Sequence, residues 1–284
     1  MNIINNKIID GQHNKPIVLD AYFKQNQTKK PIIIFVHGFK GFKDWGHFNL
    51  LAETFANAGF CFIKFNFSHN GTSPEHLTEF VDLEAFGNNN FSKELDDLGS
   101  VIDWTINNSD IDENEIDKSE IYLVGHSRGG GIAILKAYED ARIKKLVVWV
   151  SVNEYGKFWS KERMERWKSE GVMYIDNLRT KQKMPLYYQL YDDYFANLDR
   201  LHIPTAVKKL QQPFLIIHGT KDEAVPHEDA LAMHSWNKNS KMLTIENGTH
   251  VFGGKHPYTA DILPEDSQKV VDASIAFFKS QNKF

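Results

Sequence analysis

Cysteine is almost absent: the 284 residues include only Cys61. A single cysteine cannot form a disulfide within the chain, which excludes a disulfide framework and agrees with a reducing compartment. Cys61 lies in the apolar run 60–65, where a small buried core residue is expected. The first residues have neither a basic start nor a continuous apolar stretch of the kind that directs export. The expected localisation is therefore cytoplasmic.

Long apolar runs and an excess of basic charge are also missing. No stretch of about eighteen apolar residues occurs, so we expect no transmembrane helix and no membrane partner. The chain has 33 basic and 37 acidic residues, a net charge of -4, which offers no footprint for nucleic acid. Its 12 histidines show no His-Glu-x-x-His or comparable spacing, so no metal or other cofactor is expected. The expected partner is a small molecule, and the oligomeric state is left open, with a homodimer as one alternative.

Short apolar runs alternate with amphipathic segments along most of the chain. Continuous apolar runs such as 32–36 are typical of strands covered on both faces. The pattern predicts an α/β fold with a mostly parallel central sheet and helices on both faces. The predicted strands are 2–9, 16–23, 32–36, 60–65, 121–124, 144–150, 213–219 and 241–245, and the clearest helices are 48–58, 95–106, 132–137, 227–236 and one near the C-terminus.

Residues 153–205 interrupt this alternation with an aromatic and methionine-rich composition. Within them, 171–175 and 184–189 could pair as a hairpin. We expect residues 1–152 and 206–284 to form the core, and residues 153–205 to be an inserted cap or lid. Most of its aromatic side chains would form a satellite core, while a few facing the site would line an apolar acyl or aryl pocket.

Two other segments are predicted to be surface loops without chemistry. Residues 87–90, Gly-Asn-Asn-Asn, have the composition of a mobile turn. Residues 110–118 are predicted to be a solvated acidic loop.

The sequence Gly125-His126-Ser127-Arg128-Gly129 lies where the strand 121–124 ends and a helix begins. Gly-x-Ser-x-Gly at such a turn is typical of a nucleophile elbow, in which the serine takes a strained backbone conformation. Side chains at the two glycines would collide across the tight turn. A phosphate-binding turn is the alternative, but the last glycine of Gly-x-Gly-x-x-Gly is missing, and the strand 144–150 ends without a carboxylate for a ribose.

Two further strands end in loops that hold Asp222 and His250. The order serine, acid, histidine along the chain is that of α/β-hydrolases rather than of other serine enzymes. Over nearly its full length the chain resembles the α/β-hydrolase superfamily, and its insertion resembles that of bacterial cinnamoyl and feruloyl esterases and dienelactone-hydrolase-like proteins. The matching segments are His37-Gly38-Phe39, residues 125–129, residues 218–226 and Gly248-Thr249-His250.

The resemblance implies a role for each of these residues. Ser127 would be the nucleophile, His250 the general base and acid, and Asp222 the carboxylate that orients the imidazole. The backbone N–H groups of Phe39 and Arg128 would bind the oxyanion. The competing acids are Glu223 and Asp229, and the competing histidines are His126, His227 and His256.

Two residues depart from the superfamily's usual pattern, and one histidine is given a structural role. Asn66 stands where many relatives have aspartate, so its loop would be connected differently. Arg128 follows the nucleophile, where smaller or uncharged residues are commoner. A guanidinium in the pocket would favour an acidic substrate, but we expect Arg128 to point to solvent. His37 is expected to brace its loop by hydrogen bonds rather than to transfer protons.

These inferences together predict a serine hydrolase that cleaves carboxylic esters, of short acyl or of aryl and cinnamoyl type, through an acyl-enzyme intermediate. A peptidase or thioesterase with the same three residues is the alternative within enzymes. A non-catalytic binding protein that kept the fold is the alternative outside them.

Overall fold

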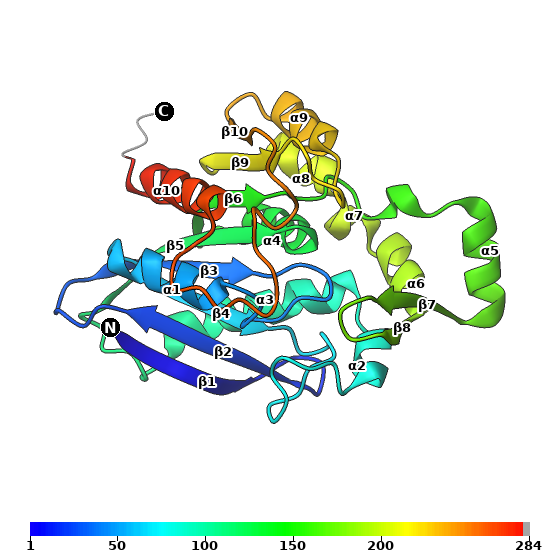
Figure 1. The fold of residues 1–284 in the computed structure, drawn as a ribbon, viewed down its shortest axis with the longest axis horizontal. Coiled ribbons are helices and arrows are strands. Elements are labelled where there is room, and N and C mark those ends of the chain that lie inside the picture. Colours follow the sequence, from blue (N-terminus) through cyan, green and yellow to red (C-terminus); the bar gives the residue numbers. More distant parts are fainter. Residues whose placement is uncertain (281–284) are drawn as a thin grey trace.

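The computed structural model describes residues 1–280, which are built around an eight-stranded sheet with the order β1-β2-β4-β3-β5-β6-β9-β10 (Figure 1). The strands from β4 to β10 in this order run parallel, and β2 is antiparallel both to β4 and to β1. The sheet strands are β1 (Asn2–Asp10), β2 (Pro16–Phe23), β3 (Lys30–Val36), β4 (Cys61–Asn66), β5 (Ile116–His126), β6 (Ile143–Trp149), β9 (Phe214–Gly219) and β10 (Lys241–Ile245).

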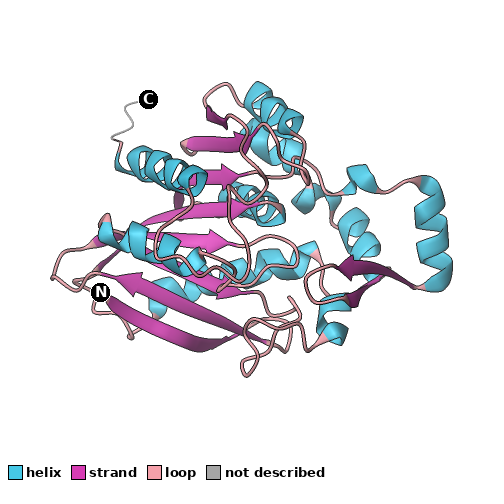
Figure 2. Cartoon of the chain, viewed as in Figure 1, coloured by secondary structure: helices cyan, strands magenta, loops and turns pink. Residues whose placement is uncertain are grey.

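Helices cover both faces of this sheet (Figure 2). One face packs against α1 (Phe48–Asn57) and α10 (Glu265–Lys279), and the other against α3 (Phe91–Asn107), α4 (Arg128–Glu139), α8 (Ile203–Lys209) and α9 (His227–Trp236). The apolar run in β3 divides between the faces: Ile32 and Ile34 pack on the α4 side and Ile33 and Phe35 on the α1 side. Strands buried on both faces need no polar alternation, and the predicted fold class is confirmed.

The segment between β6 and β9 contains most of the remaining elements. They are η1 (Gly156–Phe158), α5 (Lys161–Glu170), β7 (Val172–Asn177), β8 (Gln182–Tyr187), α6 (Gln189–Ala196) and α7 (Leu198–Leu201), while α2 (Leu83–Gly87) comes earlier in the chain. The predicted hairpin is confirmed, because β7 and β8 pair as a separate antiparallel sheet. In Figure 1 the arrowheads of β3, β6 and β9 point toward the side of the molecule on which this segment lies. Its role as a lid stays a prediction.

Both predictions of surface loops were wrong in part, because polar side chains in both segments are buried and hydrogen-bonded. Asn90 is the N-cap of α3, where its side chain accepts a hydrogen bond from the Lys93 N–H. Its neighbour Asn89 is buried and donates to Glu94. In residues 110–118, Glu115 is fully buried, because it pairs with Lys30 at 2.6 Å and accepts backbone N–H bonds from residues 26 and 27.

A buried network of four charges lies between β2, β4 and the loop that follows β3. The Lys43 and Lys64 ammonium groups lie 2.8 and 2.6 Å from the same oxygen of Asp20, and both also contact Asp44. Both lysines and Asp20 are almost completely buried. The two positive and two negative charges balance, as buried charges require. The network therefore fixes the loop after β3 to the sheet.

The substitution Lys64→Met should destabilise the protein strongly. It leaves buried carboxylates with too little positive charge, and breaking a buried pair costs about 3–5 kcal/mol of unfolding free energy. Urea unfolding followed by circular dichroism measures the change. The matched control is Lys7→Met, which breaks the half-exposed pair with Asp110 and should cost less than about 1 kcal/mol. Similar losses in the two variants would contradict the role given to the network.

Candidate active site

The turn from β5 into α4 brings three backbone segments unusually close together. Ser127 adopts φ +56° and ψ -124°, a strained conformation for a residue with a side chain. A Cβ atom on Gly129 would lie 2.3 Å from the carbonyl oxygen of His37 and 2.4 Å from that of Val36. A Cβ atom on Gly125 would lie 2.6 Å from the Gly129 carbonyl oxygen. Only glycine fits at both positions, which is the steric reason expected from the sequence.

Ser127, His250 and Asp222 form a continuous chain of hydrogen bonds. The His250 Nδ1 atom lies 2.9 Å from Oδ2 and 3.0 Å from Oδ1 of Asp222, and its Nε2 atom lies 3.0 Å from Ser127 Oγ. A carboxylate only accepts hydrogen bonds, so Nδ1 carries the proton and Nε2 presents its lone pair to the serine hydroxyl. The structure thus brings together three residues that are distant in the sequence.

Asp222 lies in surroundings that favour its charged form. Its side chain is fully buried, and it accepts hydrogen bonds from the backbone N–H groups of Ala224 and Val225, each at 2.8 Å. Burial alone would raise the pKa of Asp222, but hydrogen bonds from His218 and His250 hold that pKa well below its usual range. His218, four residues earlier in β9, was missed as a neighbour of the site although it lies in the matching segment 218–226.

The loop after β3 lies directly against Ser127. A Cβ atom on Gly38 would lie 2.9 Å from the Ser127 Cβ atom, so the following residue, Phe39, begins beside the serine. Arg128 is the first residue of α4, where N–H groups have no acceptor within the helix. Within residues 1–280, neither the Phe39 N–H nor the Arg128 N–H donates a hydrogen bond. Two unpaired backbone donors therefore flank the serine.

The expectation that the Arg128 side chain points to solvent was wrong. Its side chain is 11% exposed, and Nε and Nη2 lie 3.0 and 2.9 Å from the two carboxylate oxygens of Glu94. The guanidinium also lies over the rings of Phe39 and Phe91, at 5.1 and 4.4 Å. Glu94 lies in α3, 34 residues before its partner, so no local pattern predicted the pair. The contact ties the Arg128 side chain to that of Phe39.

The competing histidines have other partners. Half-buried His126 donates from Nε2 to the His250 carbonyl oxygen at 3.0 Å, and desolvation of its ring, together with the neighbouring His250, lowers its pKa to about 3. His227 contacts Thr244, and His256 accepts a hydrogen bond from the Gly46 N–H. None of these three rings occupies the position between the serine and Asp222.

The other candidate residues also have structural partners. His37 donates from Nδ1 to the Gly38 carbonyl oxygen, and burial lowers its pKa to about 4, which agrees with a bracing role. Glu223 accepts a bond from the His250 N–H at 3.3 Å, whereas Asp229 pairs with Lys157. Asn66 accepts from the Lys43 N–H and donates to the Thr72 hydroxyl and the Leu77 carbonyl oxygen, so it connects its loop without a charge.

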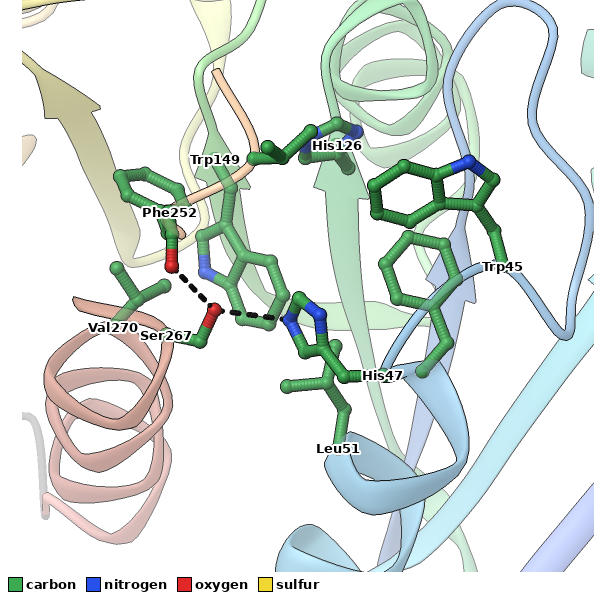
Figure 3. A pocket seen from close by; sticks show the side chains of 10 residues that line it. Trp45, His47, Leu51, His126, Trp149, Phe252, Ser267 and Val270 are labelled. Carbon is green, nitrogen blue, oxygen red and sulfur yellow. Dashed lines mark hydrogen bonds between the residues drawn. The ribbon is translucent and has the colours of Figure 1, made fainter. Parts of the chain in front are cut away.

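A cavity of about 330 Å³ opens beside Ser127. The loop after β3 and the turn between β7 and β8 both contribute to its walls. The residues that line it include Phe39, Lys40, Trp45, Asn177, Arg179 and His256. Figure 3 shows a second, apolar cavity of about 20 Å³, and the residues that line both cavities include Trp45, Phe48 and His126.

The smaller cavity has room for about one water molecule. In its wall, the Ser267 hydroxyl donates to the Phe252 carbonyl oxygen and accepts from His47 Nε2 (Figure 3). His47 Nδ1 is buried without a hydrogen-bond partner, and burial lowers the pKa of this ring to about 4. This neutral chain of bonds fixes α10 to the start of α1, behind the site.

Residues 1–280 offer neither a metal site nor a helix that could span a membrane. No group of three or more histidine, cysteine, aspartate or glutamate side chains in this part of the chain could hold a metal ion. None of the described helices combines the length and the apolar character needed to cross a membrane.

The parallel sheet, the glycine-flanked serine and the loops that meet at the strand ends define the α/β-hydrolase class, as the resemblance implied. Within this class, the chain belongs to the BD-FAE family, whose model matches residues 19–237.

Similar solved structures cover almost the whole chain. Est1E from Butyrivibrio proteoclasticus, solved with ferulic acid bound, superposes with a TM-score of 0.68 at 23% identity, covering 95% of this chain and 97% of that one. The monoacylglycerol lipase of Paleococcus ferrophilus has a TM-score of 0.66 at 15% identity, covering 92% of this chain and 98% of the lipase.

A 31.7 kDa protein from the traX-finO intergenic region of Escherichia coli is 28% identical over 182 residues, 62% of this chain and 57% of the relative. The chain thus matches only a little over half of the length of this relative.

Gly129→Ala should unfold or severely destabilise the protein, because the new methyl group would lie within 2.4 Å of two backbone carbonyl oxygens. We expect a loss of about 3 kcal/mol or more. The control is Gly99→Ala in α3, whose methyl group would meet no backbone atom and only the end of the Lys136 side chain, at 3.2 Å. Alanine is favoured over glycine in a helix by about 0.5–1 kcal/mol, so this variant should not be less stable. Equal midpoints of thermal unfolding for the two variants would contradict the conclusion that a side chain at position 129 cannot be accommodated.

Proposed function

We propose that the protein is a serine hydrolase that cleaves carboxylic esters through an acyl-enzyme intermediate. The observation that carries the proposal is the hydrogen-bond chain from Ser127 through His250 to Asp222. A serine hydroxyl is a weak nucleophile until a base takes its proton, and the lone pair of His250 Nε2 faces that hydroxyl. A binding protein that had lost catalysis would have no reason to keep this chain intact.

In the proposed reaction, Ser127 Oγ attacks the ester carbonyl while His250 accepts the hydroxyl proton. Negative charge then develops on the carbonyl oxygen, which the N–H groups of Phe39 and Arg128 would bind. Collapse of this intermediate breaks the bond to the alcohol, and His250 gives the proton to the departing oxygen. Water then repeats the sequence on the acyl-enzyme, releasing the acid and restoring the serine. Asp222 stabilises the imidazolium in both halves.

The substrate proposal and the lid proposal rest on the cavity. Its volume and the aromatic side chains of Phe39, Trp45 and Phe48 suit a short acyl or an aryl group. The ferulic acid bound to Est1E supports the aryl and cinnamoyl alternative. Residues Asn177 and Arg179 come from the turn of the β7–β8 hairpin, and their place in the cavity wall supports a lid formed by residues 153–205.

Ser127→Ala should abolish hydrolysis of short p-nitrophenyl esters, a loss of about a thousandfold or more, while the fold persists. A fluorophosphonate probe should label the unchanged protein at Ser127 and should not label this variant. The matched control is Ser119→Ala at an exposed position near the start of β5, which should keep full activity and labelling. Undiminished turnover by the Ser127 variant would reject the proposal.

Glu94→Gln should lower kcat by about tenfold with little change in KM. The Arg128 side chain loses its charged partner, so the backbone N–H of Arg128 is held less firmly in the position that binds the oxyanion. Complete loss of one oxyanion donor costs about a hundredfold or more, so partial displacement should cost less. The control is Glu139→Gln, which weakens an ion pair with Arg200 remote from the serine and should leave kcat unchanged. Equal kcat values in the two variants would exclude the positioning role of Glu94.

A further inference from the structure

The charged groups around the Ser127 cavity are of one sign. Among the described residues, those that line it include Lys40, Arg179 and three histidines but no aspartate or glutamate. The whole chain, in contrast, has more acidic than basic residues. The local excess of positive charge is therefore a property of this cavity rather than of the protein.

The two cations come from different segments of the chain. Lys40 belongs to the loop after β3, and its ammonium donates to the carbonyl oxygen of Asp176 at 3.3 Å, which joins this loop to the β7–β8 hairpin. Arg179 belongs to the turn of that hairpin, and its guanidinium lies over the rings of Phe42 and Phe80, at 5.5 and 5.9 Å. The aromatic contacts hold the guanidinium at the cavity wall.

Neither cation has a carboxylate partner within the described part of the chain. This distinguishes them from the other cations near the site, because Arg128 is paired with Glu94, and Lys43 and Lys64 are paired with two aspartates. Partial burial lowers the pKa of Arg179, so its guanidinium has lost some of its hydration. An ion with less water around it binds an opposite charge more strongly.

We propose that this site takes esters that carry a carboxylate on the part of the molecule remote from the reacting carbonyl, and that Arg179 and Lys40 bind that carboxylate. The inference rests on the proposed ester hydrolysis at Ser127. The planar guanidinium fork matches the two oxygens of a carboxylate, and the Lys40 ammonium supplies a second donor from the loop after β3. A bound carboxylate would also connect the hairpin to the loop that carries the oxyanion donor of Phe39.

The test compares esters that differ in one charge. On the acyl side, p-nitrophenyl hydrogen adipate is compared with p-nitrophenyl heptanoate. On the alcohol side, m-carboxyphenyl hexanoate is compared with phenyl hexanoate. For each pair the ratio of kcat/KM, anionic over neutral, is measured after subtraction of the uncatalysed rate.

In at least one pair the unchanged protein should give the higher kcat/KM for the anionic ester. Arg179→Gln should lower that ratio by about ten- to a hundredfold, the usual effect of a charge-assisted hydrogen bond. Arg179→Lys, which keeps the charge, should retain part of the ratio. The control Lys181→Gln removes a charge from the same turn but outside the cavity lining, and it should leave the ratio unchanged.

Three outcomes would overturn the inference. In the first, the unchanged protein has the higher kcat/KM for the neutral ester in both pairs. In the second, Arg179→Gln lowers kcat/KM equally for both esters of a pair, as a purely structural stacking role requires, and in the third, Lys181→Gln has the same effect as Arg179→Gln. Failure of the proposed function is distinguishable from all three, because then no ester is turned over and the fluorophosphonate probe does not label Ser127.

Discussion

The close approach of the first turn of α4 to the end of β3 is the constraint on which the rest of the site depends. Gly129 packs against the carbonyl oxygens of Val36 and His37 with no room for a side chain. This contact puts the N–H of the first helical residue beside the loop that follows β3, and it keeps Ser127 in its strained conformation. A wider turn would separate the serine from both backbone donors. The geometry of the site therefore requires a residue without a Cβ atom at position 129.

Buried charges then fix the two sides of this arrangement. The four-charge network of Asp20, Lys43, Asp44 and Lys64 anchors the loop after β3, and the Glu94–Arg128 pair anchors the start of α4. These charges are buried and paired, as the cost of desolvation requires. The cations of the cavity wall are the exception, because they keep aromatic or carbonyl contacts in place of carboxylates. A cation that is held in place without a carboxylate partner is available to bind an anionic group of a ligand.

The hairpin of residues 172–187 brings chain from outside the central sheet to the cavity. Its turn supplies Arg179, whose guanidinium lies over aromatic rings of residues 42 and 80, and Trp167 fixes its second strand by donating to the Leu186 carbonyl oxygen. Ser127, Asp222 and His250 belong to the elements around the central sheet, whereas the segment between β6 and β9 supplies part of the cavity wall. In the proposed ester hydrolysis, the reacting groups and part of the groups that meet the substrate therefore come from separate parts of the chain.

The sequence by itself determined the strands, the elbow and the order of the three polar residues, because each is written in local patterns: apolar runs, glycines at a turn, and polar groups after strands. Tertiary structure alone decided the partners. Glu94 reaches Arg128 from another helix, Glu115 is buried by distant N–H groups, and Asn90 donates to Gln189, 99 residues later, where its composition indicated a loose turn. Such contacts join residues far apart along the chain, and neither periodicity nor spacing records which distant side chain will meet a buried charge.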